Sequence, residues 1–177
     1  MKRLAAREIA FYALMLSMIF VLAAIEGLLP PLPMHMRFGL SNVVTMYALF
    51  FVGRRSAFAL AAMKSVFVLL TRGPVACMLS FCGGMFSLLA IALIAAVMPG
   101  ASYFILSIAG AVTHNLAQLA AASALVSTNL MLFYLPVMTA AAIPAGSVTA
   151  LLLRAVIPAL KSIGAGGEKT GASRTCV

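Results

Sequence analysis

The sequence predicts an all-α polytopic membrane protein with six transmembrane helices, and three observations support this prediction. Of the 177 residues, 64% are hydrophobic and only 8% are charged, whereas a soluble domain has about 45–50% apolar and about 25% charged residues. Long apolar runs recur along the whole chain, and Pro, Gly and Arg separate them. Each span needs about 20 residues, so six spans use nearly the whole length and leave room for one domain.

The expected spans are the apolar runs between those breaks. They cover residues 9–29, 40–52, 56–70, 79–98, 103–126 and 130–153. The prolines and glycine of PPLPMHMRFG rule out a helix between the first two spans. The second span is short, so the loop before it is expected to dip into the protein. We expect residues 1–160 to form a single six-helix membrane domain, and the small, polar residues 161–177 to form a disordered cytoplasmic tail.

The basic residues predict the orientation of the chain. With a cytoplasmic N-terminus, six spans place both termini on the cytoplasmic side of a bacterial-type inner membrane. That side then carries Lys2, Arg3, Arg7, Arg54, Arg55, Arg154 and Lys161. The outer side carries only Arg37 and Arg72, which is the asymmetry that the positive-inside rule describes. The net charge of +9 is therefore interpreted as orienting the spans, and nucleic acid is not expected as a partner.

Polar side chains within the spans mark the candidate binding site, because ionisable residues there are costly and tend to face a cavity. The candidates are Glu26, Asn42, Lys64, His114, Asn115 and Gln118. On a helix, His114 and Gln118 share one face, and Asn115 lies about 100° to the side of His114. We expect this group to bind a ligand or line its pathway. The alternative is hydrogen bonding between helices.

Arg37 and Arg72 lie in segments broken by Pro and Gly, where they are expected to attract an anionic ligand. The alternative for both is an ordinary loop arginine that faces water or lipid headgroups. Glu26 is expected to pair with one of these arginines or with a cationic part of the ligand. Lys64 is expected to bind an anionic group of the ligand or to extend towards an interface.

Several kinds of chemistry are missing from the chain. It contains no Asp, no P-loop motif, no GxSxG or HExxH motif and no paired carboxylates. A self-contained enzyme, a bound cofactor and a metal centre are therefore not expected. Met34, His35 and Met36 could form a Met/His metal site, but packing is the default role of Met. Phe38 and Phe81 are expected to cover the apolar part of a ligand.

Four stretches resemble a known family in their order and spacing. They are EGLLPPLP (26–33), RFGLSNVVTMYAL (37–49), SFCGGMFSLL (80–89) and GAVTHNLAQ (110–118). Together they resemble the Gx transporter family, also labelled heptaprenyl diphosphate synthase component I, over residues 8–155. That family is similar to the S components of energy-coupling-factor (ECF) transporters. The resemblance implies a six-helix protein that captures a vitamin-like molecule from outside, with a separate membrane coupling protein and two ATPases as partners.

Two other functions remain open. The older family label implies a non-catalytic membrane subunit beside an Asp-rich prenyltransferase in isoprenoid or quinone biosynthesis. A stand-alone ion- or proton-coupled carrier would use His114 as a proton relay, although the spans offer no second carboxylate to take the proton onward. We expect a small, anionic substrate and the lipid bilayer as partners in the preferred interpretation.

Overall fold

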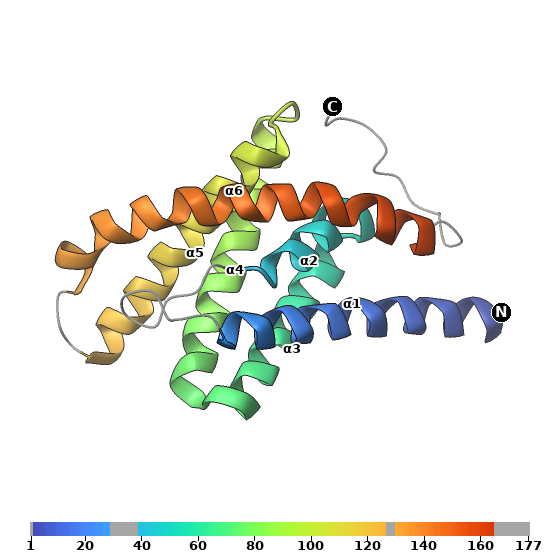
Figure 1. Cartoon of the computed structure of the whole chain (residues 1–177), viewed down its shortest axis with the longest axis horizontal. Coiled ribbons are helices and arrows are strands. Elements are labelled where there is room, and N and C mark those ends of the chain that lie inside the picture. The colour runs from blue at the N-terminus through green and yellow to red at the C-terminus, as the bar shows by residue number, and fades with distance from the viewer. Residues whose placement is uncertain (1, 29–38, 127–129, 165–177) are drawn as a thin grey trace.

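The computed structural model of the chain describes residues 2–28, 39–126 and 130–164 (Figure 1). Its helices are α1 (Lys2–Leu28), α2 (Asn42–Tyr47), α3 (Arg54–Arg72), α4 (Pro74–Val97), α5 (Tyr103–Val126) and α6 (Leu130–Gly164). A π-helical turn, η2 (Ala48–Val52), continues α2. These described parts of the chain contain no strand, and the all-α prediction is confirmed.

Four helices are long and apolar enough to cross a membrane. The crossing segments are Glu8–Leu28, Pro74–Val97, Tyr103–Leu125 and Phe133–Ser162. Large apolar side chains on their outer surfaces are exposed, among them Ile9, Leu93 and Phe133. Exposed apolar surface of this extent fits lipid and not water. The chain is therefore a multi-pass helical membrane protein.

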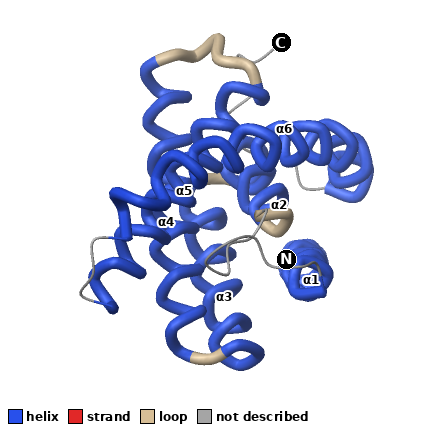
Figure 2. The backbone as a smooth tube through the Cα atoms, turned by 60° about the vertical axis from the view of Figure 1, so that its left-hand side comes forward, coloured by secondary structure: helices blue, strands red, loops and turns tan. Residues whose placement is uncertain are grey.

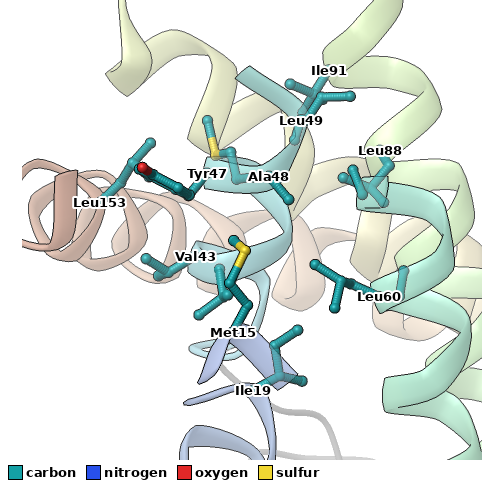
Figure 3. Packing of buried hydrophobic residues seen from close by; sticks show 14 of the residues in the cluster. Met15, Ile19, Val43, Tyr47, Ala48, Leu49, Leu60, Leu88, Ile91 and Leu153 are labelled. Carbon is teal, nitrogen blue, oxygen red and sulfur yellow. The ribbon is translucent and has the colours of Figure 1, made fainter. Parts of the chain in front are cut away.

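The short segment Asn42–Val52 forms the centre of the structure. Every residue from Val43 to Leu49 is buried. Figure 3 shows the side chains of α1, α3, α4 and α6 that surround it, including Met15, Leu60 and Leu153. A helix that is apolar on all sides is stable when protein covers all of its faces, and residues 43–49 meet that condition.

The long helices lie in two directions around this centre. In Figure 1, α1 and α6 run in opposite directions along the long axis of the molecule, and α4 crosses that axis. Figure 2, in which α1 is seen nearly end-on, agrees with this arrangement. Helix α4 packs against both α3 and α5, and α5 packs against α6. The single residue Gly73, with a φ of 89°, turns the chain between α3 and α4.

Two expected boundaries are wrong. The sixth span was expected to end at residue 153, but α6 continues to Gly164 with Pro136, Pro144 and Pro158 inside it. Neighbouring helices and local adjustments compensate for proline in membrane helices. The fourth span was expected to begin at residue 79, but α4 begins at Pro74, because proline fits the first turn of a helix. Most of the expected tail, residues 165–177, lies outside the described residues.

Candidate functional site

A cavity of about 340 Å³ opens between α1, α3, α4, α5 and α6. Its volume falls at the lower end of the range for small-molecule sites, about 300–1,000 Å³. Its lining includes six polar side chains from four helices: Glu26, Lys64, Arg72, Ser80, His114 and Gln118. Because polar and charged groups are costly inside a membrane protein, their convergence on one cavity makes it the candidate site.

A chain of hydrogen bonds joins three elements beside this cavity. The buried Lys64 Nζ on α3 donates to Asn42 Oδ1 at the start of α2, over 2.7 Å. Asn42 Nδ2 lies 3.4 Å from Nδ1 of the buried His114 on α5. Since an ammonium group can only donate, it orients the Asn42 amide with its oxygen towards Lys64 and its nitrogen towards His114. Asn42 therefore fixes the relative positions of Lys64 and His114.

Glu26 connects the end of α1 to the start of α2. Its Oε1 accepts a hydrogen bond from the Leu40 backbone N–H at 2.9 Å, and its Oε2 accepts one from Ser41 Oγ at 3.4 Å. Gly39 precedes this contact with a φ of 73°, and a Cβ there would lie 2.8 Å from Asn42 Nδ2. Glycine is therefore required where the chain enters α2.

Arg72, the last residue of α3, contacts α1 at the same cavity. Its Nη2 donates to the Ala23 carbonyl oxygen. Glu26 and Arg72 were expected to pair with each other as one alternative, but they form no ion pair with each other in the part of the chain that the structure describes. The other expected arginine, Arg37, lies outside the described residues.

The polar group on α5 divides between two environments. His114 and Gln118 line the cavity, whereas the buried Asn115 points towards α6, where its Nδ2 donates to the Met138 carbonyl oxygen at 3.3 Å. Met138 itself also lines the cavity. The structure therefore gives Asn115 the contact between helices that was the alternative interpretation of the whole group.

Gly83 allows α4 to approach this face of α5. A Cβ at Gly83 would lie 2.7 Å from His114 Cε1 and 2.9 Å from Gln118 Cγ. Contacts that short do not occur without displacement of one partner. The absence of a side chain at Gly83 thus determines where the imidazole of His114 and the side chain of Gln118 can lie.

A second, much smaller cavity of about 20 Å³ lies on the other side of His114. Four hydroxyl groups line it, those of Thr45, Ser87, Ser107 and Thr149. Thr45 and Thr149 donate to carbonyls of their own turns, Ser87 donates to Gly110 O on α5, and Ser107 donates to Met46 Sδ. Asn115 also lines this cavity. It has room for about one water molecule. Among the described residues that line it, His114 is the one ionisable side chain.

Sequence reasoning missed three residues of the site and misplaced one. Ser80, Gly83 and Gly39 were not singled out, because an isolated serine or glycine gives no signal without its neighbours. Phe81 was expected over the ligand, but it is 46% exposed and does not line the cavity. Phe38 and the alternative metal site at residues 34–36 lie outside the described residues.

The comparison with protein families identifies the chain. The family model for heptaprenyl diphosphate synthase component I matches residues 15–156, a range that includes every polar residue of the cavity. No curated protein and no solved structure matches the chain significantly. Since the family model covers well over half of the 177 residues, the chain belongs to the heptaprenyl diphosphate synthase component I family.

Proposed function

We propose that the chain is a membrane substrate-binding subunit, similar to an ECF S component, that captures a small anionic molecule for uptake. The observation that supports this most directly is the cavity of about 340 Å³ with charged side chains in an otherwise apolar helix bundle. Ionisable groups at membrane depth typically mark a substrate or ion pathway. In this proposal Asn115 joins α5 to α6, and the other residues predicted from the sequence act in binding. These are Glu26, Arg37, Asn42, Lys64, Arg72, His114 and Gln118.

The charges of the cavity favour an anion. Lys64 and Arg72 supply two cations, and Glu26 supplies the single carboxylate among the described lining residues. Both oxygens of Glu26 already accept hydrogen bonds from the two residues that precede α2. A ligand with a carboxylate or phosphate group would therefore meet a net positive site, and the attraction is strongest for the buried Lys64, because less water surrounds it.

The helix ends support a topology of six segments with both termini in the cytoplasm. In Figure 1 the start of α1, the end of α6 and the α4–α5 connection lie towards the right and the top. The α3–α4 connection, the end of α5 and the start of α6 lie towards the bottom and the left. In this topology Arg72 is on the outer side, where a substrate would enter. Because the sequence has no P-loop, separate ATPase partners and a coupling protein would supply the energy.

The test is mass spectrometry of small molecules released by denaturing the gently purified protein. The wild-type protein should release a near-stoichiometric anionic compound. Lys64→Gln should weaken its retention at least about tenfold, since hydrogen bonds to charged groups contribute about 1.5–3 kcal/mol. Gln118→Ala shortens a half-buried side chain on the wall of the cavity, so it tests the site with less risk to folding.

Lys161→Gln is the matched control. It removes the same charge from an exposed side chain at the end of α6, whose Nζ lies 4.7 Å from the centroid of the Phe51 ring. It should retain the compound like the wild type. A wild-type protein that releases no small molecule and gains no thermal stability from any anion would refute the proposal.

A second candidate function rests on the family match itself. The family label describes one component of a prenyl diphosphate synthase, and the chain contains no Asp with which to hold magnesium. It would then be a non-catalytic membrane subunit of a soluble prenyltransferase. This alternative predicts that co-expression changes the rate or product length of the catalytic subunit, and that Lys64→Gln leaves this effect intact.

A further inference from the structure

The lining of the large cavity changes character along its length. Helices α3 and α4 form a hairpin whose turn is Gly73, and the turn lies at the lower edge of the molecule in Figure 1. Residues close to Gly73 in sequence, such as Arg72 and Val75, therefore lie near that end of the cavity. Residues further along both helices, such as Lys64 and Ser80, lie deeper.

The inner end of the cavity is polar, and neighbouring residues hold its side chains in place. Lys64, Ser80 and His114 are all buried there, with exposures of 6%, 8% and 4%. The Asn42 side chain fixes Lys64 relative to His114. An ammonium, a hydroxyl and an imidazole together suit an acidic group with several acceptor oxygens.

The middle of the cavity is aliphatic. Val68 lies one helical turn from Lys64 on α3, and Leu119 lies beside Gln118 on α5; both are buried. Leu79 on α4 lines the same stretch. These branched side chains offer no hydrogen bond, so a ligand gains there by burying hydrocarbon.

The outer end is cationic again. Arg72 lies eight residues beyond Lys64 on α3, which is about 12 Å along the helix axis. Its guanidinium has five N–H donors, and within the part of the chain that the structure describes its Nη2 donates to Ala23 O. The remaining donors can bind a second acidic group in a two-pronged contact.

We infer that the ligand is an elongated molecule with an acidic group at each end and an aliphatic middle. One acid binds Lys64 at the inner end, the chain packs against Val68, Leu79 and Leu119, and the other acid binds Arg72. This inference rests on the proposed function and narrows its substrate class. Glu26 disfavours a third acidic group, because that group would meet a carboxylate at the wall of the cavity.

Equilibrium dialysis of the detergent-purified protein tests this with α,ω-dicarboxylates from succinate through adipate and suberate to sebacate. Affinity should pass through an optimum at an intermediate length, since a shorter diacid reaches one cation at a time and a longer one must bend to fit between both. The monocarboxylate of the same chain length should bind at least about tenfold more weakly, because it lacks one charge-assisted contact. Both comparisons use the wild-type protein, so they do not depend on the folding of a variant.

Variants then identify which cation binds each acidic group of the ligand. Arg72→Gln should remove the advantage of the diacid over the monoacid, and Lys64→Gln should weaken binding of both. Lys161→Gln should change neither. Equal affinity for diacids and monoacids, or no dependence on length, would overturn the inference, as would stronger binding of ω-amino acids, which would instead indicate a cationic group at Glu26.

The two proposals fail in different ways. A compound that co-purifies with the wild type and is lost in Lys64→Gln, while no dicarboxylate binds, would leave the substrate-binding function standing and refute the two-acid ligand. A protein that holds no native compound and binds no dicarboxylate would refute both.

Discussion

The two cavities on either side of His114 show how the same bundle uses polar groups for different purposes. In the large cavity of about 340 Å³, Lys64 and Glu26 make contacts across different elements, with charges that a ligand can neutralise. In the small cavity of about 20 Å³, two hydroxyl groups donate within their own helices and two donate to a neighbouring helix, and all four are uncharged. The first arrangement places charged groups on the wall of an accessible volume, whereas the second satisfies buried hydroxyl groups.

The difference shows that polarity alone does not identify a binding site in a membrane protein. Hydroxyl groups that bond the preceding turn are tolerated in membrane helices at little cost. Buried charges are costly unless something pairs with them. The distinguishing property is therefore the presence of charge in an accessible volume, and substitutions on the two sides of His114 should have separable effects on stability and on binding.

The largest effect on stability is expected on the small-cavity side, from Gly146→Ala. A Cβ at Gly146 would lie 2.6 Å from Ile108 Cα and 3.0 Å from Ile108 N, so α5 and α6 would have to separate. Overpacking of this kind costs about 1–3 kcal/mol. Unfolding in detergent should show a clear loss of stability.

Gly84→Ala is the control for that measurement, since its Cβ would meet nothing closer than Ala61 Cβ at 3.8 Å. Both substitutions gain the same helix propensity, up to about 1 kcal/mol. Equal stability of the two variants would mean that α5 and α6 are less tightly packed than the structure indicates.

A smaller effect on stability but a larger one on binding is expected from Gly83→Ala. The new methyl group would displace the His114 ring and the Gln118 side chain, and with them the contact to Asn42. Binding of the co-purifying compound should weaken at least about tenfold, by the loss of one hydrogen bond in a site with charges. The neighbouring Gly84→Ala should bind like the wild type. A Gly83→Ala protein with full affinity would remove His114 and Gln118 from the site.

The smallest effect is expected from Thr149→Val in the small cavity. Within the described parts of the chain its hydroxyl bonds Ala145 O in its own helix, and hydrogen bonds in membrane helices contribute about 0.6 kcal/mol on average. Stability should fall by less than about 1 kcal/mol and ligand affinity should not change. Thr139→Val, whose exposed hydroxyl bonds Leu135 O in the same way, is the control. A loss of affinity in Thr149→Val but not in Thr139→Val would show that both cavities belong to one binding site.

Most of the fold could be predicted from the apolar runs and their breaks. The span expected at residues 103–126 coincides with α5, because Pro99 and Gly100 mark its start clearly. The end of α6 could not be predicted in this way. Arg154 and Pro158 are break signals in a sequence, but packing against neighbouring helices keeps the helix continuous.

The candidate site was only partly predictable for a related reason. The cost of charge in a membrane pointed to Glu26, Lys64 and His114, all of which line the large cavity. The separation of Asn115 from His114 depends on where α4 and α6 lie around α5, which no local pattern specifies. The role of Gly83 is likewise a property of the space between two helices.

The short central segment has a consequence for how the protein enters the bilayer. Residues 42–52 extend about 16 Å as a helix, roughly half of the hydrocarbon thickness of about 30 Å. A segment that short is a poor substrate for the insertion machinery when it emerges by itself. We expect it to reach its place only once α1, α3, α4 and α6 are present to enclose it. The segment contains no cysteine, so the test introduces one as Thr45→Cys in a chain whose native cysteines are replaced by serine. Truncation before α6 should leave this thiol accessible to water-soluble reagents during biogenesis, and the complete chain should protect it.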